Sequence, residues 1–336
     1  MMLKNFLLFI SLIFIFSCTT SVNETLYSIS GITMGTTYSI KFITEKPINN
    51  NNIKAKIDTL LEHLNMQMST YIPTSELSEF NNYKDTTWFS VSEELAFVIE
   101  NALQVSKISK GKFDITIGPL VNLWGFGPGN IPLLIPSEKE IEKARKNIGY
   151  NKLSVRFSPP ALKKANPKIY CDLSAIAKGY AVDLVSELLY SEGIKNYLVE
   201  IGGEVRSSGK KSGKSWRVGI SAPNQTHTVQ EVVYLTNLAM ATSGSYWNYF
   251  EENGKRYSHT IDPHTGKPIT HKLVSVSVVD SACMMADALA TAIDVMGPKE
   301  GLEFAKRYNL SVYLIVKEKN TYKTIYTPQF SSLMKE

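Results

Sequence analysis

The sequence YCDLSAIAKGYAVDLVSELLYSEGIKNYLVEI, at residues 170–201, joins a predicted helix to a predicted strand. Apolar side chains recur at helical spacing from Ile176 to Leu189, and Gly193 is a typical residue to end such a helix. Residues 197–201 are rich in side chains that favour strands, and similar runs follow as far as Val279. A strand-rich region therefore follows this helix.

The rest of the chain mixes the same two kinds of element. Apolar residues recur at helical spacing over residues 53–64, 92–111 and 285–296, and we expect the third of these helices to end at Gly297-Pro298. Strand-forming residues lie on both sides of the turn-forming Met34-Gly35-Thr36. Because helices and strands do not alternate strictly, the pattern indicates an α+β fold rather than a doubly wound sheet.

The N-terminus has the features of an export signal. Lys4 precedes an unbroken apolar run from Phe6 to Phe16, which is too short to span a bilayer. The ending Ser17-Cys18 resembles a lipoprotein cleavage box, so we expect residues 1–17 to be removed and Cys18 to carry the lipid. The protein would then be anchored on the periplasmic, extracytoplasmic side of a cell membrane. An ordinary secretory signal with an incidental cysteine is the alternative.

Composition indicates a folded protein behind this signal. The chain has 336 residues, of which 43% are hydrophobic and 20% charged. Residues 18–26 are a short spacer after the anchor, and residues 27–330 are expected to form the folded domain. The net charge of +5 comes from scattered lysines rather than a basic stripe with interleaved aromatic residues, so we expect no nucleic-acid partner.

Two cysteines remain once Cys18 is set aside. Cys171 and Cys283 are too few for a disulfide framework, and each lies in an apolar context, so two buried thiols are the preferred interpretation. Cys171 lies four residues before Ala175, and Cys283 lies four before Asp287. These matched offsets leave open that the two thiols are neighbours and pair.

The segment from Gly111 to Gly129 contains more glycine than a core requires. We expect loops at Gly118-Pro119 and from Gly125 to Gly129. Glycine lets the backbone approach a ligand closely, and backbone amides of such loops suit phosphate oxygens. The spacing is not that of the dinucleotide-binding fingerprint, and a plain surface loop is the alternative.

A strand-to-helix junction holds Asp172, Ser174 and Lys178. Asp172 and Ser174 can cap the helix that follows, or the same helix N-terminus can bind an anion. Lys178 lies one turn into the helix, where the helix dipole disfavours a positive charge. This placement favours an anionic ligand.

Residues 259–266 form a turn dense in polar groups. His259 and His264 suggest metal ligation, but no further ligand completes a zinc set. A turn stabilised by Asp262 and Gly266 is the alternative.

Two side chains with oxygen atoms lie on the predicted helix 285–296. Asp287 and Thr291 are four residues apart and therefore share one face of that helix. Carboxylate and hydroxyl oxygens without a soft ligand suit a hard cation such as Mg²⁺.

These segments together resemble the ApbE-type flavin transferases, exported lipoproteins that split FAD and attach FMN covalently to threonine in a target protein. The resemblance covers the chain from residue 27 to 330, with its motifs in family order. The motifs are Met34-Gly35-Thr36, Ser69-Thr70-Tyr71, residues 113–127, Asp172 to Asp183, His259 to Pro268, and Ala286 to Thr291. The resemblance implies a T-fold-related α+β architecture that binds FAD in a cleft.

Position by position, the resemblance also implies roles for individual residues. The implied FAD site is lined by Met34, Tyr71, Lys112, Phe113, Asp114, Asp172, Lys178 and Ile261. The implied Mg²⁺ ligands are the backbone carbonyl of Ala175, Asp287 and Thr291. His259 is the implied general base, with Asp287 as the alternative. The rings of Tyr71, Phe113 and Trp124 can stack on FAD or belong to the core.

The implied reaction is attack of a threonine hydroxyl on the phosphorus next to riboflavin, with AMP leaving. Implied acceptors are exported proteins with a Ser/Thr-Gly/Ala-Ala-Thr-like motif, such as subunits of sodium-pumping NADH:quinone oxidoreductase and of Rnf-type complexes. Two alternatives remain open at this point. One is an FAD pyrophosphatase that uses water as the acceptor, and the other is a non-catalytic FAD-binding lipoprotein.

Overall fold

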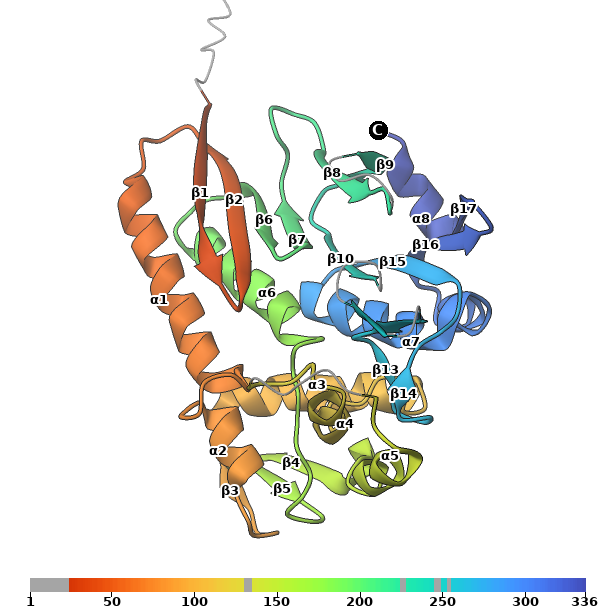
Figure 1. Cartoon of the computed structure of the whole chain (residues 1–336). Helices are drawn as coiled ribbons and strands as arrows, with labels where there is room; N and C mark the ends of the chain where they lie inside the picture. Colours follow the sequence, from red (N-terminus) through yellow and green to blue (C-terminus); the bar gives the residue numbers. More distant parts are fainter. Residues whose placement is uncertain (1–23, 130–134, 224–227, 245–248, 253–254) are drawn as a thin grey trace, which may run out of the picture.

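The computed structural model describes residues 24–129, 135–223, 228–244, 249–252 and 255–336. The architecture is α+β, as the sequence pattern predicts, with one large antiparallel sheet and helices packed against it (Figure 1). Cys18 and the predicted signal peptide lie outside the described residues.

The central sheet has eight strands in the order β1-β2-β6-β7-β10-β15-β16-β17, and every neighbouring pair is antiparallel. The strands are β1 (Thr25–Thr33), β2 (Thr36–Thr44), β6 (Asn196–Ile201), β7 (Glu204–Ser208), β10 (Ala239–Gly244), β15 (Leu273–Asp280), β16 (Ser311–Glu318) and β17 (Thr321–Tyr326). The predicted turn between β1 and β2 is confirmed, because Met34 and Gly35 both adopt positive φ (49° and 70°).

Smaller strand groups surround this sheet. They are β3 (Phe89–Ser90), β4 (Leu153–Phe157) and β5 (Pro160–Lys164) in one sheet, and the pairs β8 (Trp216–Ser221) with β9 (Val229–Leu235), β11 (Tyr249–Glu252) with β12 (Lys255–Ser258), and β13 (Ile261–Asp262) with β14 (Lys267–Pro268).

The helices that the periodicity predicts are present. The helices are α1 (Asn50–Met68), α2 (Glu76–Asn82), α3 (Glu93–Ile108), α4 (Gly118–Leu123), α5 (Glu138–Arg145), α6 (Ala177–Ser191), α7 (Cys283–Arg307) and α8 (Pro328–Ser331), with short 3₁₀ turns at Tyr150–Lys152 and Ser332–Met334. Ser92 caps α3 as expected, since its hydroxyl accepts a hydrogen bond from the N–H of Leu95.

Of two expectations about glycine and proline, one is wrong and one is confirmed. Gly118-Pro119 begins the short helix α4 instead of forming a loop, because proline is well suited to the first turn of a helix. The expected end of a helix at Gly297-Pro298 is confirmed, because Gly297 has a non-helical backbone (φ 76°, ψ −179°). A second helical segment follows as far as Arg307, and the two segments together carry the label α7. Proline lacks an N–H, so it can start the second half of α7 without losing a hydrogen bond.

The central strands are buried on both faces. On β16, Val312 and Leu314 pack into the core beneath α6 and α7, whereas Tyr313 and Ile315 pack against β8, β9 and α8. Full burial of an aliphatic side chain contributes roughly 1.5–3 kcal/mol, so this double burial holds the sheet between the two layers. The edges of these layers leave room for the site described below.

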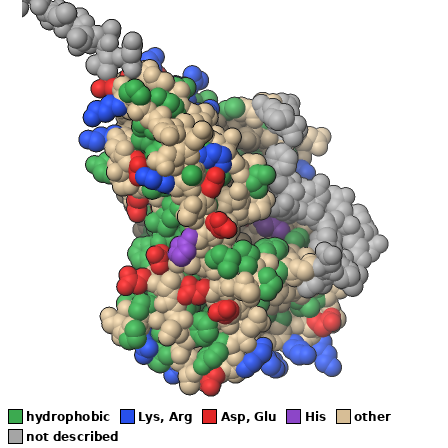
Figure 2. All heavy atoms as spheres, turned by 90° about the vertical axis from the view of Figure 1, so that its left-hand side faces the viewer, with side chains coloured by type: hydrophobic (Ala, Val, Ile, Leu, Met, Phe, Trp, Pro, Cys, Tyr) green, Lys and Arg blue, Asp and Glu red, His purple; other side chains and the backbone are tan. Residues whose placement is uncertain are grey.

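The surface charge is spread over the molecule rather than gathered in one stripe. Figure 2 shows acidic side chains near the middle of one face, with Lys and Arg mostly toward its upper and lower ends. Within the described residues, no helix is both long enough and apolar enough to cross a membrane.

Candidate active site

A cavity of about 790 Å³ is lined by residues of the central sheet, of helix α7 and of the segments that connect the elements around them. Its wall is built by the β1–β2 turn, the segments 112–121, 172–178 and 259–263, the β6–β7 turn, β8, β10 and α7. The lining includes these sequence-predicted site residues: Met34, Lys112, Phe113, Asp114, Asp172, Ala175, Lys178, His259, Ile261, Asp287 and Thr291. The fold thus brings together residues that are up to 257 positions apart in the chain, from Met34 to Thr291.

Tyr71 is the predicted FAD-site residue that does not line this cavity. Its side chain is 66% exposed and its hydroxyl donates a 3.3 Å hydrogen bond to the carbonyl of Phe126. Partial burial and then the charge of Asp172 raise the Tyr71 pKa. Trp124, by contrast, is buried and donates from its indole nitrogen to the carbonyl of Gly266, so its ring belongs to a small core.

Lys178 and Asp287 meet where α6 crosses α7. Lys178 Nζ lies 2.6 Å from a carboxylate oxygen of Glu204, and the backbone N–H of Gly179 donates a 3.0 Å hydrogen bond to Asp287 Oδ2. The positive charge near the start of α6 is therefore matched by protein carboxylates. This finding explains the placement of Lys178 without requiring an anionic ligand at the helix N-terminus.

The three charged groups at this crossing influence one another. Burial raises the pKa of Glu204 to about 8, against the attraction of Lys178. Burial likewise raises the pKa of Asp287. Although burial lowers the pKa of Lys178, the charges of Asp287 and Glu204 raise it above its usual value. Two buried carboxylates face one lysine at this wall, and burial favours the neutral form of both carboxylates.

The oxygen atoms at this wall fit a hard cation. Asp287 and Thr291 lie one turn apart on α7, and Ala175 lines the same cavity just before α6. The second carboxylate oxygen of Glu204 is buried and has no hydrogen-bond partner among the described residues. In the described part of the chain, no group of three or more His, Cys, Asp and Glu side chains is arranged to hold a metal. A cation here would therefore depend on carbonyl and hydroxyl oxygens and on ligand oxygens, as Mg²⁺ commonly does.

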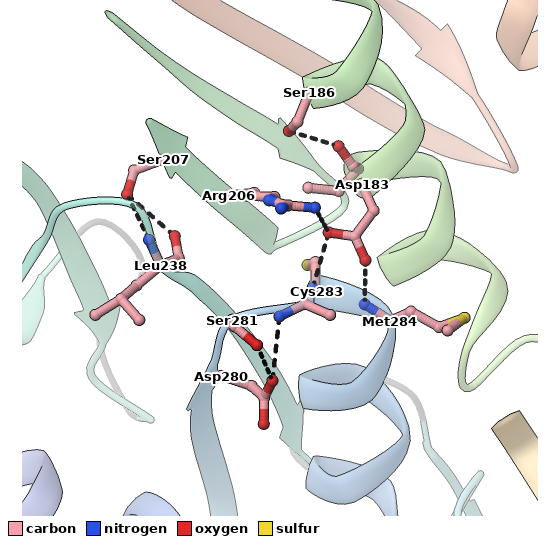
Figure 3. Close-up of polar contacts among 11 residues, drawn as sticks. Asp183, Ser186, Arg206, Ser207, Leu238, Asp280, Ser281, Cys283 and Met284 are labelled. Atoms are coloured by element: carbon pink, nitrogen blue, oxygen red, sulfur yellow. Dashed lines mark hydrogen bonds and ion pairs between the residues drawn. The ribbon is translucent and has the colours of Figure 1, made fainter. Parts of the chain in front are cut away.

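Asp183 fixes the position of α7 relative to α6. Figure 3 shows its carboxylate pointing at the first turn of α7, where it accepts 2.9 Å hydrogen bonds from the N–H groups of Cys283 and Met284. Arg206 Nη1 holds the same carboxylate at 2.6 Å. Because the N-cap residue Ala282 supplies no side-chain cap, Asp183 satisfies two of the free N–H groups at this helix end.

The segment before α6 differs from the expected capping. Asp172 Oδ1 accepts from the N–H of Ser174, but α6 begins only at Ala177 and has no side-chain cap. Neither Asp172 nor Ser174 therefore caps the helix. Cys171 and Cys283 are buried free thiols, so the disulfide hypothesis is wrong and the two-thiol interpretation is confirmed.

The segment 112–114 combines structural and cavity-lining roles. Lys112 Nζ lies 3.2 Å from Asp262 Oδ2, which ties this segment to the turn after β13. The Asp114 carboxylate accepts hydrogen bonds from the N–H groups of Thr116 and Tyr150 and from the Thr116 hydroxyl. Burial raises the Asp114 pKa, although these hydrogen bonds act in the opposite direction.

The two histidines of segment 259–266 have different surroundings. His259 lines the cavity and its ring lies edge-on to Phe126 at 6.4 Å. The His264 ring lies 3.0 Å from the carbonyl of Lys110, outside the cavity lining. Asp262 and Gly266 stabilise the turn through a 2.8 Å backbone hydrogen bond, as the structural alternative predicts.

Sequence reasoning missed Glu204, Ser243 and Thr260, which also line the cavity. Glu204 directly follows the Gly202-Gly203 turn, where both glycines have positive φ. The pair Gly202-Gly203, which joins β6 to β7, was the signal available in the sequence. It does not reveal that Glu204 forms an ion pair with Lys178.

Comparisons with known proteins agree with this geometry. Residues 34–314 match the ApbE family. Proteins named FAD:protein FMN transferase from Vibrio cholerae, Haemophilus influenzae and Escherichia coli are 44%, 42% and 41% identical to this chain. Each alignment covers 91% of this chain, and it covers 92%, 91% and 88% of the respective relative.

Solved structures give the same result. A structure described as flavin transferase ApbE from Vibrio cholerae superposes with a TM-score of 0.86 at 42% identity and covers 93% of this chain and 100% of that chain. The apo form of the Pseudomonas stutzeri flavinyl transferase ApbE also gives 0.86, at 36% identity, and covers 93% and 97%.

Proposed function

The chain belongs to the ApbE family, and from this we propose that it is a magnesium-dependent FAD:protein FMN transferase that attaches FMN to a threonine of exported proteins. It is a flavin transferase, as its curated relatives are. The observation that carries the finer proposal is the cavity wall where Ala175, Lys178, Asp287 and Thr291 meet. This wall combines the hard oxygen donors of Ala175, Asp287 and Thr291 with the ammonium group of Lys178. The cavity is of the size that holds an extended small molecule.

The residues that would hold Mg²⁺ are Asp287, Thr291 and the backbone carbonyl of Ala175. When bound, the ion would offset the negative charge that develops on pyrophosphate oxygens. Lys178 supplies a permanent positive charge beside the same wall, since its raised pKa keeps it protonated at neutral pH.

In the proposed reaction, the threonine hydroxyl oxygen attacks the phosphorus that carries riboflavin. A bond forms between that oxygen and phosphorus while the bond from phosphorus to the bridging oxygen breaks. AMP leaves with the electron pair of the broken bond, and the threonine proton passes to a base of the enzyme. FMN then remains attached to the threonine as a phosphate diester.

We assign the base to His259 rather than Asp287. His259 lines the cavity, and neutral imidazole accepts protons well near neutral pH. Asp287 already accepts a hydrogen bond from Gly179 and is a proposed metal ligand, so its lone pairs are committed. His259→Ala should therefore lower the rate of transfer more than it weakens FAD binding.

The same proposal includes the proteins that accept FMN and the cellular location of the enzyme. An acceptor would present a threonine in a short Ser/Thr-Gly/Ala-Ala-Thr-like motif, as in exported NADH:quinone oxidoreductase or Rnf-type subunits. The export signal in residues 1–17 and the lipid on Cys18 would hold the enzyme at the extracytoplasmic face of a membrane, where such acceptors lie.

The test uses a soluble form that starts after Cys18, incubated with FAD, Mg²⁺ and a protein that bears the threonine motif. Mass spectrometry should detect an FMN-sized increment on that threonine, and EDTA or Asp287→Ala should abolish it. Asp85→Ala, which removes an exposed carboxylate far from the cavity, is the matched control and should leave the increment intact. Steady release of FMN and AMP without any adduct would identify a pyrophosphatase, and metal-independent FAD binding without turnover would identify a binding protein.

A further inference from the structure

Two hydroxyl groups on the cavity wall share one buried carboxylate behind them. Ser243, on β10, and Thr260, just before β13, both line the cavity. Their hydroxyls donate hydrogen bonds of 3.3 Å and 3.2 Å to the same atom, Asp294 Oδ2. Asp294 lies on α7, two turns beyond Asp287, and none of its surface is exposed.

The carboxylate of Asp294 is short of hydrogen-bond donors. Its other oxygen, Oδ1, is buried and has no partner among the described residues. Burial raises the pKa of Asp294 to about 7, so above that pH the carboxylate is ionised and can only accept hydrogen bonds. Asp294 then has a strong demand for the hydroxyl hydrogens that it receives from Ser243 and Thr260.

The hydrogen bonds to Asp294 determine which hydrogen-bonding groups of Ser243 and Thr260 remain for a ligand in the cavity. A hydroxyl has one hydrogen and two acceptor lone pairs. Because both hydrogens point back toward Asp294, the lone pairs are left for a ligand. The wall at Ser243 and Thr260 therefore matches a ligand N–H group and does not match a phosphate oxygen, which is itself an acceptor.

We propose that Ser243 and Thr260 form a subsite that accepts hydrogen bonds from an N–H group of a ring of FAD, with Asp294 as the residue that orients both hydroxyls. This inference rests on the proposed function, because it takes FAD as the ligand. FAD carries two ring-borne N–H groups of this kind, the 6-amino group of adenine and N3–H of isoalloxazine. The phosphates would then lie at the other wall, near Lys178.

The experiment measures binding of FAD and two analogues to the soluble enzyme at about pH 8, where Asp294 is ionised, and in EDTA, so that no turnover occurs. One analogue carries hypoxanthine in place of adenine, which replaces the amino group with a carbonyl. The other carries a methyl group on N3 of isoalloxazine. We expect wild type to bind one of the two analogues about tenfold more weakly than FAD, since one hydrogen bond is lost and a buried acceptor is left unpaired.

Variants locate this preference in the structure. Thr260→Val and Ser243→Ala should each weaken FAD binding and reduce the penalty for the same analogue severalfold, because the acceptor is gone. Thr236→Val is the matched control: it removes a hydroxyl that donates to Ser215 and lies outside the cavity lining, and it should keep the full penalty. A merely structural role would weaken FAD and both analogues equally.

Two results would overturn the subsite. Equal binding of FAD and both analogues to wild type is one, and a penalty that persists unchanged in both cavity variants is the other. Either result, with tight binding of FAD itself, would leave the proposed function standing. Absence of FAD binding to wild type would overturn both proposals.

Discussion

The backbone N–H of Gly179 on α6 donates a hydrogen bond to the carboxylate of Asp287 on α7, at 3.0 Å. The two helices can approach so closely only because residue 179 has no side chain. A Cβ atom at this position would lie 2.5 Å from the carbonyl oxygen of Cys283 and 2.8 Å from Met284 Cα, both of them backbone atoms. The proposed metal ligand is thus placed by direct contact between two backbones.

Gly179→Ala should separate α6 from α7 and displace Asp287. We expect a loss of roughly 1–3 kcal/mol in the free energy of unfolding, typical of overpacking, together with weaker metal binding. Urea unfolding and the Mg²⁺ concentration that gives half-maximal FMN transfer measure the two effects. Gly301→Ala is the matched control on the same helix: its Cβ would meet Ile293 Cγ2 at 2.7 Å, so it should also lower stability, but it lies away from the contact between Gly179 and Asp287 and should leave the Mg²⁺ dependence unchanged. Unchanged Mg²⁺ dependence in Gly179→Ala would contradict the placement of Asp287.

Asp183→Asn tests the capping of α7 from the neighbouring helix. Asparagine has a single acceptor oxygen, so it can accept hydrogen bonds from only some of the groups that donate to Asp183, which are the N–H groups of Cys283 and Met284 and the guanidinium of Arg206. The negative charge that pairs with Arg206 is also lost. We expect the protein to lose roughly 2 kcal/mol of unfolding free energy and to need more Mg²⁺ for half-maximal activity. Ser137→Ala, which removes the cap of α5, should cost about 1 kcal/mol without changing the Mg²⁺ requirement. If both variants change only stability, Asp183 does not position the site.

Glu204→Gln tests how the carboxylates share Lys178. The test is made above about pH 8, where Glu204 is ionised. Without the charge of Glu204, Lys178 should then pair with Asp287 and compete with Mg²⁺ for that carboxylate. The Mg²⁺ concentration for half-maximal transfer should therefore rise, by about tenfold if one charge interaction of about 1.4 kcal/mol is redirected. Glu200→Gln is the contrast, because Glu200 lines the same cavity but accepts its hydrogen bond from the N–H of Gly203. An equal rise in both variants would indicate a general effect of cavity charge.

Local patterns in the sequence were sufficient for the four longest helices, α1, α3, α6 and α7, and for part of the site. Asp287 and Thr291 could be paired because a four-residue spacing places two side chains on one helix face, whatever the helix packs against. The turn at Met34-Gly35 was equally readable, because its residues tolerate positive φ.

Contacts between distant elements could not be predicted in this way. Lys178 and Glu204 are 26 residues apart and meet only because the β6–β7 turn packs beside the start of α6. Asp294 looked like an ordinary polar residue near the end of a predicted helix, and nothing in the sequence showed that Ser243 and Thr260 would bond to it. Gly118-Pro119 was ambiguous, since the same pair suits a loop and the first turn of a helix.

Asp294 also gives the protein a distinctive dependence of stability on pH. Burial raises its pKa from the usual 3.8 to about 7. Between these values the folded protein holds a proton that the unfolded chain has released, so the contribution of Asp294 to stability is complete below about pH 4 and is lost as the pH rises to about 7. Asp294→Asn has no such titration.

We therefore expect the free energy of unfolding of wild type, relative to Asp294→Asn, to fall by up to about 4 kcal/mol between pH 4 and pH 7, and to stay level above pH 7. Urea unfolding of both proteins across this range measures the difference. His271, whose ring contacts the backbone carbonyl of Asp294 and whose pKa is lowered by burial, titrates in both proteins, so its effect cancels in the comparison. A difference that does not change with pH would show that Asp294 keeps an ordinary pKa, which would require a positively charged or hydrogen-bonding partner for its Oδ1.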